Sequence, residues 1–510
     1  MKHFGQSEKI KAEYCCQVVR INQLTPIEGS DFLAKTVVAG NTIVVRKDEF
    51  KEGDYALYAK NETALNSEFL SVNNLFELHE YERNKNAKEV EKLLANGEKD
   101  EAKKITGFFN KYGRVKALKL RGVYSMGFLF HLETLAKWKP EVKFENLASY
   151  IVNEEMGIGE NFDTVCGEEF IKAYVPYTPP RSYNQVGDRR ERKRQKKVER
   201  FERIADSSWK FHYDTLKLND NIWMINPEDT VNVSIKFHGS SAIFGNVKIK
   251  CPAKLSFAQK TWNYIAQKSF ELYQWLEKKT TQTWYEDYGN VYSSRGVIKN
   301  KYINKAVSNG FYETDIWYEF NELLKPYVDK GMMIYGEICG YVTGGEKMIQ
   351  KSYDYGCNVG ENFFMPYRIT TVDEESGETK EWNIDEVVSW TNHLTEVHPE
   401  LKNKIKPMAV LYHGTLSKLY PEIETNDGHW HENVLEAMKS DKTHFGMEEK
   451  ETLCKHKVPR EGICIRVDDK PNIKAMKLKS NAFYAKEQKS IDAGEVDIEM
   501  MDAYVEGGSN

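Results

Sequence analysis

Apolar and polar residues alternate strictly from position 231 to position 238. The apolar set is Val231, Val233, Ile235 and Phe237, and the polar set is Asn232, Ser234, Lys236 and His238. A period of two predicts a half-buried strand that carries Lys236 and His238 on its polar face. Gly239 then breaks the strand and allows a tight turn that a phosphate can approach. A lysine so placed can be a nucleophile, but the pattern alone also fits a surface lysine at the end of a hairpin strand.

The first third of the chain repeats short apolar segments separated by turns. Residues 12 to about 80 follow this pattern, which is typical of a small β-barrel. Residues 84–107 change period, with Val90, Leu93 and Leu94 amid Lys and Glu, and predict an inserted amphipathic helix. The strand pattern returns at residues 114–127.

A charged segment divides the chain. Residues 181–203 hold ten basic and four acidic residues and follow a turn-rich stretch, which indicates a linker with a solvated basic helix. The positive charge of this segment is consistent with a solvent-exposed helix face or with contacts to the phosphates of a nucleic acid. We expect a barrel domain at 1–175, a basic linker at 176–205, a second domain at 206–490 with a helix near 257–279, and an acidic tail at 491–510.

Composition limits the class of protein. A chain of 510 residues with 40% hydrophobic and 12% aromatic content is expected to form two or three ordered domains. The net charge of -5 neither supports nor excludes nucleic-acid binding. Apolar runs of membrane-spanning length and the apolar core of a signal peptide are absent, so we expect a soluble, intracellular protein without a membrane partner. The eight cysteines are irregularly spaced and predict reduced thiols.

Three candidate functional residues follow Lys236, each at a separate strand. Arg295 comes after a short polar strand and is suited to holding a ribose or a phosphate. Glu337 interrupts an apolar strand, where a carboxylate needs a hydrogen-bond or metal partner. Phe364 offers a flat face for a purine. Taken singly, Arg295 fits an ordinary surface arginine equally well, and Phe364 fits a residue packed in the core equally well.

Two further clusters lie near the C-terminus. Glu461 precedes the apolar strand at 462–467, and Lys477 and Lys479 lie two residues apart. The two lysines should therefore share one strand face and form a cationic pair suited to a polyphosphate, although a solvated strand face is the alternative. The order of all these clusters after Lys236 indicates function more strongly than any one of them.

That order resembles the covalent nucleotidyltransferase superfamily of ligases and capping enzymes. Six motifs appear in the family's order across residues 236–479: the lysine motif, an arginine strand, a GlyGlu strand, an aromatic strand, a GluGly strand and a LysXLys strand. The whole chain further resembles the Deinococcus-type RNA ligases (the RNA ligase 5 family), on residues 114–127 and on Tyr353 to Gly356. The resemblance implies an α+β protein, in which an OB-like β-barrel domain precedes a nucleotidyltransferase domain of antiparallel, ATP-grasp-like sheets with helices.

The resemblance also implies a role for each motif residue. Lys236 would take AMP, and His238 matches the histidine of RNA ligase 2-like enzymes, where DNA ligases and capping enzymes usually have Asp. The remaining implied ligands are Gly239 at the nucleotide, Arg295 and Glu337 at ribose and phosphates, Phe364 on adenine, Glu337 and Glu461 near Mg²⁺ or Mn²⁺, and Lys477 and Lys479 at phosphates.

A lysine attacks phosphorus only when neutral, yet its ordinary pKa is about 10.4. Lys477, Lys479 and a divalent ion would lower that pKa by disfavouring the ammonium. We therefore expect an ATP-dependent RNA ligase that forms lysyl-AMP, passes AMP to a 5′-phosphate and seals it to a 3′-hydroxyl. The expected partner is RNA, as nicked duplex RNA or an RNA/DNA hybrid in RNA repair, bound by a monomer.

Two other classes of protein remain open. One is a DNA ligase or an RNA capping enzyme, against which His238 and the N-terminal position of the barrel domain argue. The other is a non-catalytic RNA-binding protein that keeps the ligase scaffold. The presence of all the lysines expected for the chemistry favours an enzyme.

Overall fold

The computed structural model describes residues 3–142, 157–175, 203–252, 284–299 and 312–492, apart from positions 9, 206, 214, 313, 374–375, 427, 448–449 and 471–474. The expected linker at 176–205 lies outside these residues except for its last three positions, of which Arg203–Ile204 form strand β14. The helix expected near 257–279 and all but the first two residues of the expected tail also lie outside them.

The N-terminal part is built from short antiparallel strands. Its main sheet has the order β10-β2-β6-β9-β8, with β10 (Asn161–Phe162), β2 (Cys16–Arg20), β6 (Tyr55–Lys60), β9 (Val123–His131) and β8 (Ala117–Leu120). A second sheet joins β3 (Thr25–Pro26), β4 (Leu33–Val38) and β5 (Asn41–Arg46). Smaller pairings join β7 (Thr63–Leu65) to β13 (Ile171–Ala173), and β1 (Phe4–Gly5) and β12 (Glu168–Glu169) to β11 (Thr164–Val165). The strands expected for residues 12–80 are therefore present from Cys16 to Leu65, whereas the rest of that range contains helix α1 (Ser67–Val72) and a 3₁₀ helix (Leu78–Arg83).

Helices cover one end of this barrel. They are α1 (Ser67–Val72), α2 (Ala87–Ala95), α3 (Lys99–Lys104) and α4 (Glu133–Trp138). The single helix expected at 84–107 is wrong in detail, because this segment forms two helices. Gly97, with φ +81°, adopts the left-handed conformation that ends α2, and α3 then starts in a new direction. Val90 is the residue of α2 that is buried.

The C-terminal part contains two antiparallel sheets. The larger runs β19-β18-β17-β20-β21-β22, through β19 (Ile298–Lys299), β18 (Trp284–Ser293), β17 (Ser240–Pro252), β20 (Met332–Gly340), β21 (Asn362–Val372) and β22 (Thr379–Glu381). The smaller runs β15-β25-β24-β16-β23, through β15 (Leu216–Lys217), β25 (Met476–Lys479), β24 (Gly462–Arg466), β16 (Thr230–Lys236) and β23 (Val410–Thr415); within it only the β15–β25 pair is parallel.

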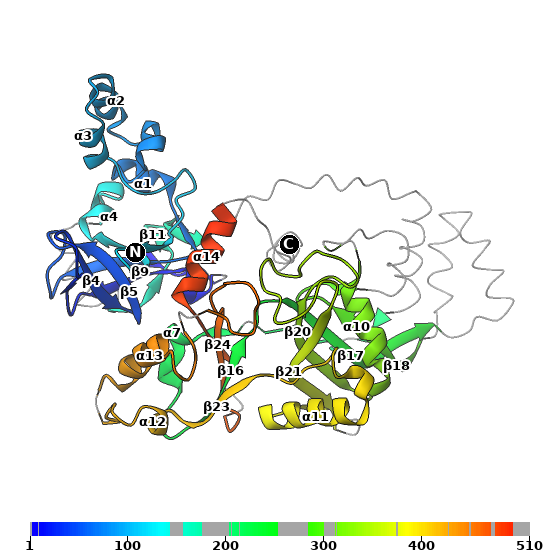
Figure 1. The fold of residues 1–510 in the computed structure, drawn as a ribbon. Coiled ribbons are helices and arrows are strands. Elements are labelled where there is room, and N and C mark those ends of the chain that lie inside the picture. Colours follow the sequence, from blue (N-terminus) through cyan, green and yellow to red (C-terminus); the bar gives the residue numbers. More distant parts are fainter. Residues whose placement is uncertain are drawn as a thin grey trace, which may run out of the picture.

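Helices pack on both sheets and between the two parts (Figure 1). Helices α10 (Ile316–Leu324) and α11 (Ile384–Val397) share an apolar core with one face of the larger sheet. Helices α7 (Leu218–Asn221), α12 (Leu416–Leu419) and α13 (Trp430–Ser440) pack on the smaller sheet. Helix α14 (Asn481–Asp492) contacts β8 and β9 and so joins the C-terminal part to the N-terminal one.

Strand β16 differs from its expected form in two ways. It is an interior strand of the smaller sheet, between β23 and β24, and Asn232 and Ser234 on its polar face are buried as well. The strand also ends at Lys236, which leaves His238 in the connection to β17. The lysine therefore lies at a strand end inside the protein and not on a solvated hairpin.

All eight cysteines are free, as the sequence predicts. Within the described ranges, every helix is too short or too polar to cross a membrane.

Candidate active site

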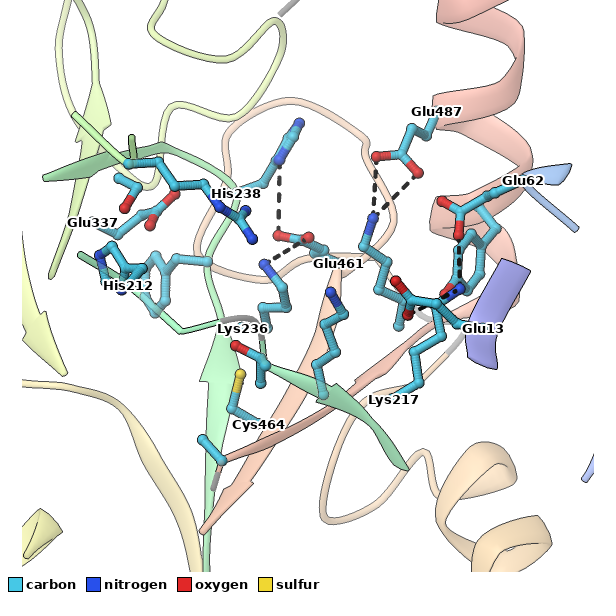
Figure 2. Close-up of a pocket in the computed structure, with 18 of the residues that line it drawn as sticks. Glu13, Glu62, His212, Lys217, Lys236, His238, Glu337, Glu461, Cys464 and Glu487 are labelled. Atoms are coloured by element: carbon cyan, nitrogen blue, oxygen red, sulfur yellow. Dashed lines mark hydrogen bonds and ion pairs between the residues drawn. The ribbon is translucent and has the colours of Figure 1, made fainter. Parts of the chain in front are cut away.

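Lys236 lies at the end of β16, opposite Gly462 on β24. This pairing brings its Nζ to 2.8 Å from Oε1 of Glu461, whose side chain is 3% exposed (Figure 2). The two residues are 225 positions apart in sequence, and only the sheet register joins them. The ion pair favours the ammonium form of Lys236, so attack by this amine requires that the pair first breaks.

His238 is held by aromatic rings. Its ring meets Tyr353 and Phe483 edge to face, with centroids 5.0 Å away in both cases. Its backbone N–H donates to the hydroxyl of Tyr355 at 2.7 Å, and its Nδ1 lies 3.8 Å from Oε2 of Glu461. Lys236 and His238 therefore converge on one carboxylate from two sides.

Gly239 is required by close packing. Its N–H donates to Oε1 of Glu337 at 3.0 Å, and Gln350 donates to its carbonyl at 2.9 Å. A Cβ at this position would lie 2.4 Å from the carbonyl oxygen of Ile338. The hydrogen bond from Gly239 gives the buried Glu337 carboxylate the polar partner that its strand position demands.

Lys477 and Lys479 share one face of β25, as the sequence predicts, and both face the same cavity as Lys236. Burial, together with the neighbouring Lys479, lowers the pKa of Lys477. Burial alone would lower the pKa of Lys479 too, but Glu487, Glu62 and Glu461 raise it well above its ordinary value. Lys479 pairs with Glu487 of α14 at 3.2 Å. The pKa values of the two lysines therefore shift in opposite directions.

The cavity has a volume of about 880 Å³ and runs between the two sheets to the N-terminal part. This size is typical of small-molecule sites, which span roughly 300–1,000 Å³. Its described lining holds nine lysine and arginine side chains against five glutamates. The excess of positive charge suits a polyanionic ligand.

Arg295 and Glu337 both line this cavity, together with Gly296 of the arginine motif. The sequence motifs for Lys236, His238, Arg295, Glu337, Glu461, Lys477 and Lys479 thus meet at one cavity.

Phe364 does not belong to the cavity lining, so its expected contact with adenine is wrong for this arrangement. Its side chain is fully buried on the opposite face of β21, in the core under α10 and α11. The ring lies across Gly336, where a Cβ would come within 2.4 Å of it, and meets Phe244 edge to face at 5.0 Å. Met365, the next residue on the strand, points to the cavity instead.

Sequence reasoning missed several residues that line the cavity, among them Glu62 and Glu13 of the N-terminal part. Lys217 of β15 pairs with Glu62 at 3.0 Å and with Glu13 at 3.6 Å (Figure 2). Burial lowers the pKa of Lys217, but Glu62 and its other neighbours raise it well above its ordinary value. Arg368 and Arg466 also line the cavity. The Leu216–Lys217 segment gave no motif, and sequence alone cannot pair residues that are about 155 positions apart.

The residues fit a divalent ion held mainly by substrate oxygens. Among the described residues, buried Glu461 Oε2 has no hydrogen-bond partner, and Glu461 lines the same cavity as Glu337. Hard cations prefer such carboxylate oxygens. Within the described ranges, however, three or more His, Cys, Asp or Glu side chains never cluster as a metal cage would require.

Two family models match separate parts of the chain. An OB-fold domain model matches residues 15–93, within the N-terminal part. The RNA ligase family matches residues 229–479, a range that contains every motif from Lys236 to Lys479. The C-terminal part is therefore similar to the RNA ligase family over these residues.

Comparison with curated proteins finds no match. Among solved structures, a Naegleria gruberi RNA ligase with PPi is 16% identical, with a TM-score of 0.46 over 93% of this chain and 99% of that one. A mutant of the same ligase with AMP and Mn is also 16% identical, with a TM-score of 0.47 over 93% and 98% of the two chains.

Proposed function

We propose that this protein is an ATP-dependent RNA ligase of the Deinococcus type, in which Lys236 forms a covalent lysyl-AMP. The observation that carries the proposal is the position of Lys236. Its amine reaches a cavity of about 880 Å³ that Lys477 and Lys479 also line. The match of this region to the RNA ligase family supports the same chemistry.

The first step joins the lysine to the nucleotide. The neutral Nζ of Lys236 attacks the α-phosphorus of ATP, a P–N bond forms, and the bond to the pyrophosphate oxygen breaks. Lys477 and Lys479 stabilise charge on the transferring phosphoryl group and on pyrophosphate. The same lysines disfavour the ammonium of Lys236 and so oppose its ion pair with Glu461.

The next steps move AMP and then release it. A 5′-phosphate oxygen of RNA attacks the phosphorus of lysyl-AMP, and Lys236 leaves as an amine. A 3′-hydroxyl then attacks the activated 5′-phosphate, forms the phosphodiester and releases AMP. The covalent intermediate divides one difficult displacement into easier ones.

Mg²⁺ or Mn²⁺ would be held by Glu461, with Glu337 nearby, and would supply additional positive charge at the phosphates. Arg295 would hold the ribose or a phosphate. With Phe364 turned away, Met365 and Cys464 line the cavity and would contact the nucleotide. Burial raises the pKa of Cys464 to about 11, which keeps it a neutral thiol.

The proposed substrate is a nick in duplex RNA or in an RNA/DNA hybrid, bound in part by the OB-fold domain. Incubation of the purified protein with α-labelled ATP tests the first step, because lysyl-AMP formation labels the protein. A panel of nicks that varies the sugar on each side of the break tests the substrate. Efficient sealing of all-DNA nicks alone would favour a DNA ligase, and labelling by GTP but not ATP would favour a capping enzyme.

A further inference from the structure

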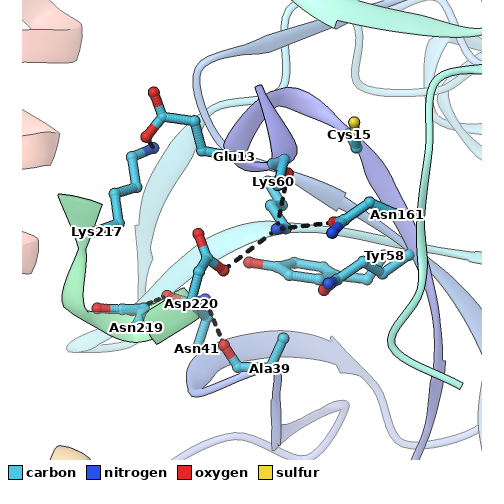
Figure 3. A network of polar contacts seen from close by, with 12 residues as sticks. Glu13, Cys15, Ala39, Asn41, Tyr58, Lys60, Asn161, Lys217, Asn219 and Asp220 are labelled. Atoms are coloured by element: carbon cyan, nitrogen blue, oxygen red, sulfur yellow. Dashed lines mark hydrogen bonds and ion pairs between the residues drawn. The ribbon is translucent and has the colours of Figure 1, made fainter. Parts of the chain in front are cut away.

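A second, smaller cavity lies where the OB-fold domain meets the ligase domain. Its volume is about 30 Å³, and it lies behind the lysines of the active site (Figure 3 shows part of its wall). Lys477, Lys479 and Asn61 line both cavities, whereas Lys439 of α13 lines only the small one. The OB-fold domain packs closely here, since a Cβ at Gly40 would lie 2.6 Å from Leu435 of α13.

The walls of the small cavity are strongly cationic. They contain five lysines and, among the described residues, a single carboxylate, Asp220. Three of the lysines have ion pairs: Lys60 with Asp220 at 3.2 Å, Lys217 with Glu62 at 3.0 Å, and Lys479 with Glu487 at 3.2 Å.

The other two lysines, Lys439 and Lys477, have neither an ion-pair nor a hydrogen-bond partner in the part of the chain that the structure describes. Burial lowers the pKa of Lys439 to about 8, against the raising effect of Glu436 and Asp220. Burial and Lys479 lower the pKa of Lys477. Both shifts express the cost of burying ammonium groups beside a cavity whose carboxylate, Asp220, is already paired with Lys60.

Asn61 supplies an independent sign of a ligand. The residue is 8% exposed, and its Nδ2 is buried without a hydrogen-bond partner among the described residues. Buried amide N–H groups normally have partners, so this open donor, on a residue that lines the cavity, is available to a polar ligand. Asn61 comes from the OB-fold domain, while Lys439 and Lys477 come from the ligase domain.

We propose that a single phosphate-sized oxyanion binds in this cavity, accepts from Asn61, Lys439 and Lys477, and bridges the two domains. A volume of about 30 Å³ admits one small anion and not a nucleotide. The bound anion would offset the two unpaired ammonium groups and hold the OB-fold domain against the lysines of the active site.

Thermal unfolding of the full chain tests the site. In buffer without phosphate and at constant ionic strength, addition of inorganic phosphate should raise the Tm saturably, by about 1–3 °C at ten to a hundred times Kd. Lys439→Met should raise the half-saturating phosphate concentration at least tenfold. Lys442→Met, at an exposed lysine three residues further on, should respond like the unchanged protein.

Asn61→Asp gives a second variant, because its carboxylate would repel the anion while every lysine is retained; it too should lose the response. If phosphate raises the Tm of Lys439→Met and Asn61→Asp as much as it raises the Tm of the unchanged protein, the proposal is overturned. Parallel titrations with pyrophosphate and AMP separate the sources of the phosphate. Stabilisation by these two and not by inorganic phosphate would show an extension of the nucleotide site, and would equally overturn it.

Discussion

Glu62 of the OB-fold domain stabilises the fold through Lys217, and this contact yields a prediction with a defined pH dependence. Burial alone raises the pKa of Glu62, but Lys217 and Lys479 outweigh it and lower the pKa from 4.5 to about 2. Because the folded-state pKa lies below the unfolded one, the stabilisation is complete above about pH 4.5 and is lost as the pH falls towards 2.

The magnitude follows from that difference. A change from 4.5 to about 2 corresponds to about 3 kcal/mol, and screening of a side chain that is 30% exposed reduces this to about 2 kcal/mol. Unfolding entropy of about 2.1 cal/mol/K per residue gives about 1.1 kcal/mol/K for 510 residues. Glu62→Gln should therefore lower the Tm by about 2 °C at pH 7.

Calorimetry at two pH values provides the assay. At pH 3.5 the difference in Tm between Glu62→Gln and the unchanged protein should shrink to about 60% of its value at pH 7. Glu28→Gln, at an exposed glutamate, is the matched control and should leave the Tm unchanged. A Glu62→Gln variant as stable as this control, or a difference that stays constant between the two pH values, would refute the ionic role of Glu62.

Three further substitutions test the active site. Lys477→Ala should slow single-turnover labelling by ATP about 10²–10³-fold through loss of charge at the phosphates, and a rate within threefold of the unchanged protein would contradict this role. Phe364→Leu should cost about 1–2 kcal/mol of stability and leave the KM for ATP unchanged, since the ring packs in the core; a raised KM would restore the stacking role. His238→Ala should slow joining of a pre-adenylylated nick about 10²-fold while the protein remains folded by circular dichroism, and normal joining would exclude a role for His238.

Local patterns predicted much of the site because each motif occupies one strand or strand end. The spacing of Lys477 and Lys479 placed both lysines on one face, and the order of motifs brought Glu461 into the same site as Lys236. Such reasoning could not predict which face of β21 turns to the cavity. Phe363, Phe364 and Met365 are all apolar and buried, so period two gives no sign of which of them turns to the cavity.

Contacts between the domains were also beyond the sequence. Glu62 and Lys217 are single charged residues in separate segments, and their pairing depends on how the OB-fold domain packs on the ligase domain. The burial of both faces of β16 likewise depends on segments far away in the sequence, such as helices α7, α12 and α13 on its apolar face. The alternation of polar residues in this strand suggested a solvated face, whereas those residues are enclosed.

The central claim is that Lys236 is the residue that receives AMP. Mass spectrometry of peptides after reaction with ATP and a divalent ion measures this directly. The proposal predicts an added AMP on Lys236, its complete loss in Lys236→Ala, and its persistence in Lys442→Met. Adenylylation of another lysine in the unchanged protein, or continued labelling of Lys236→Ala, would contradict the account.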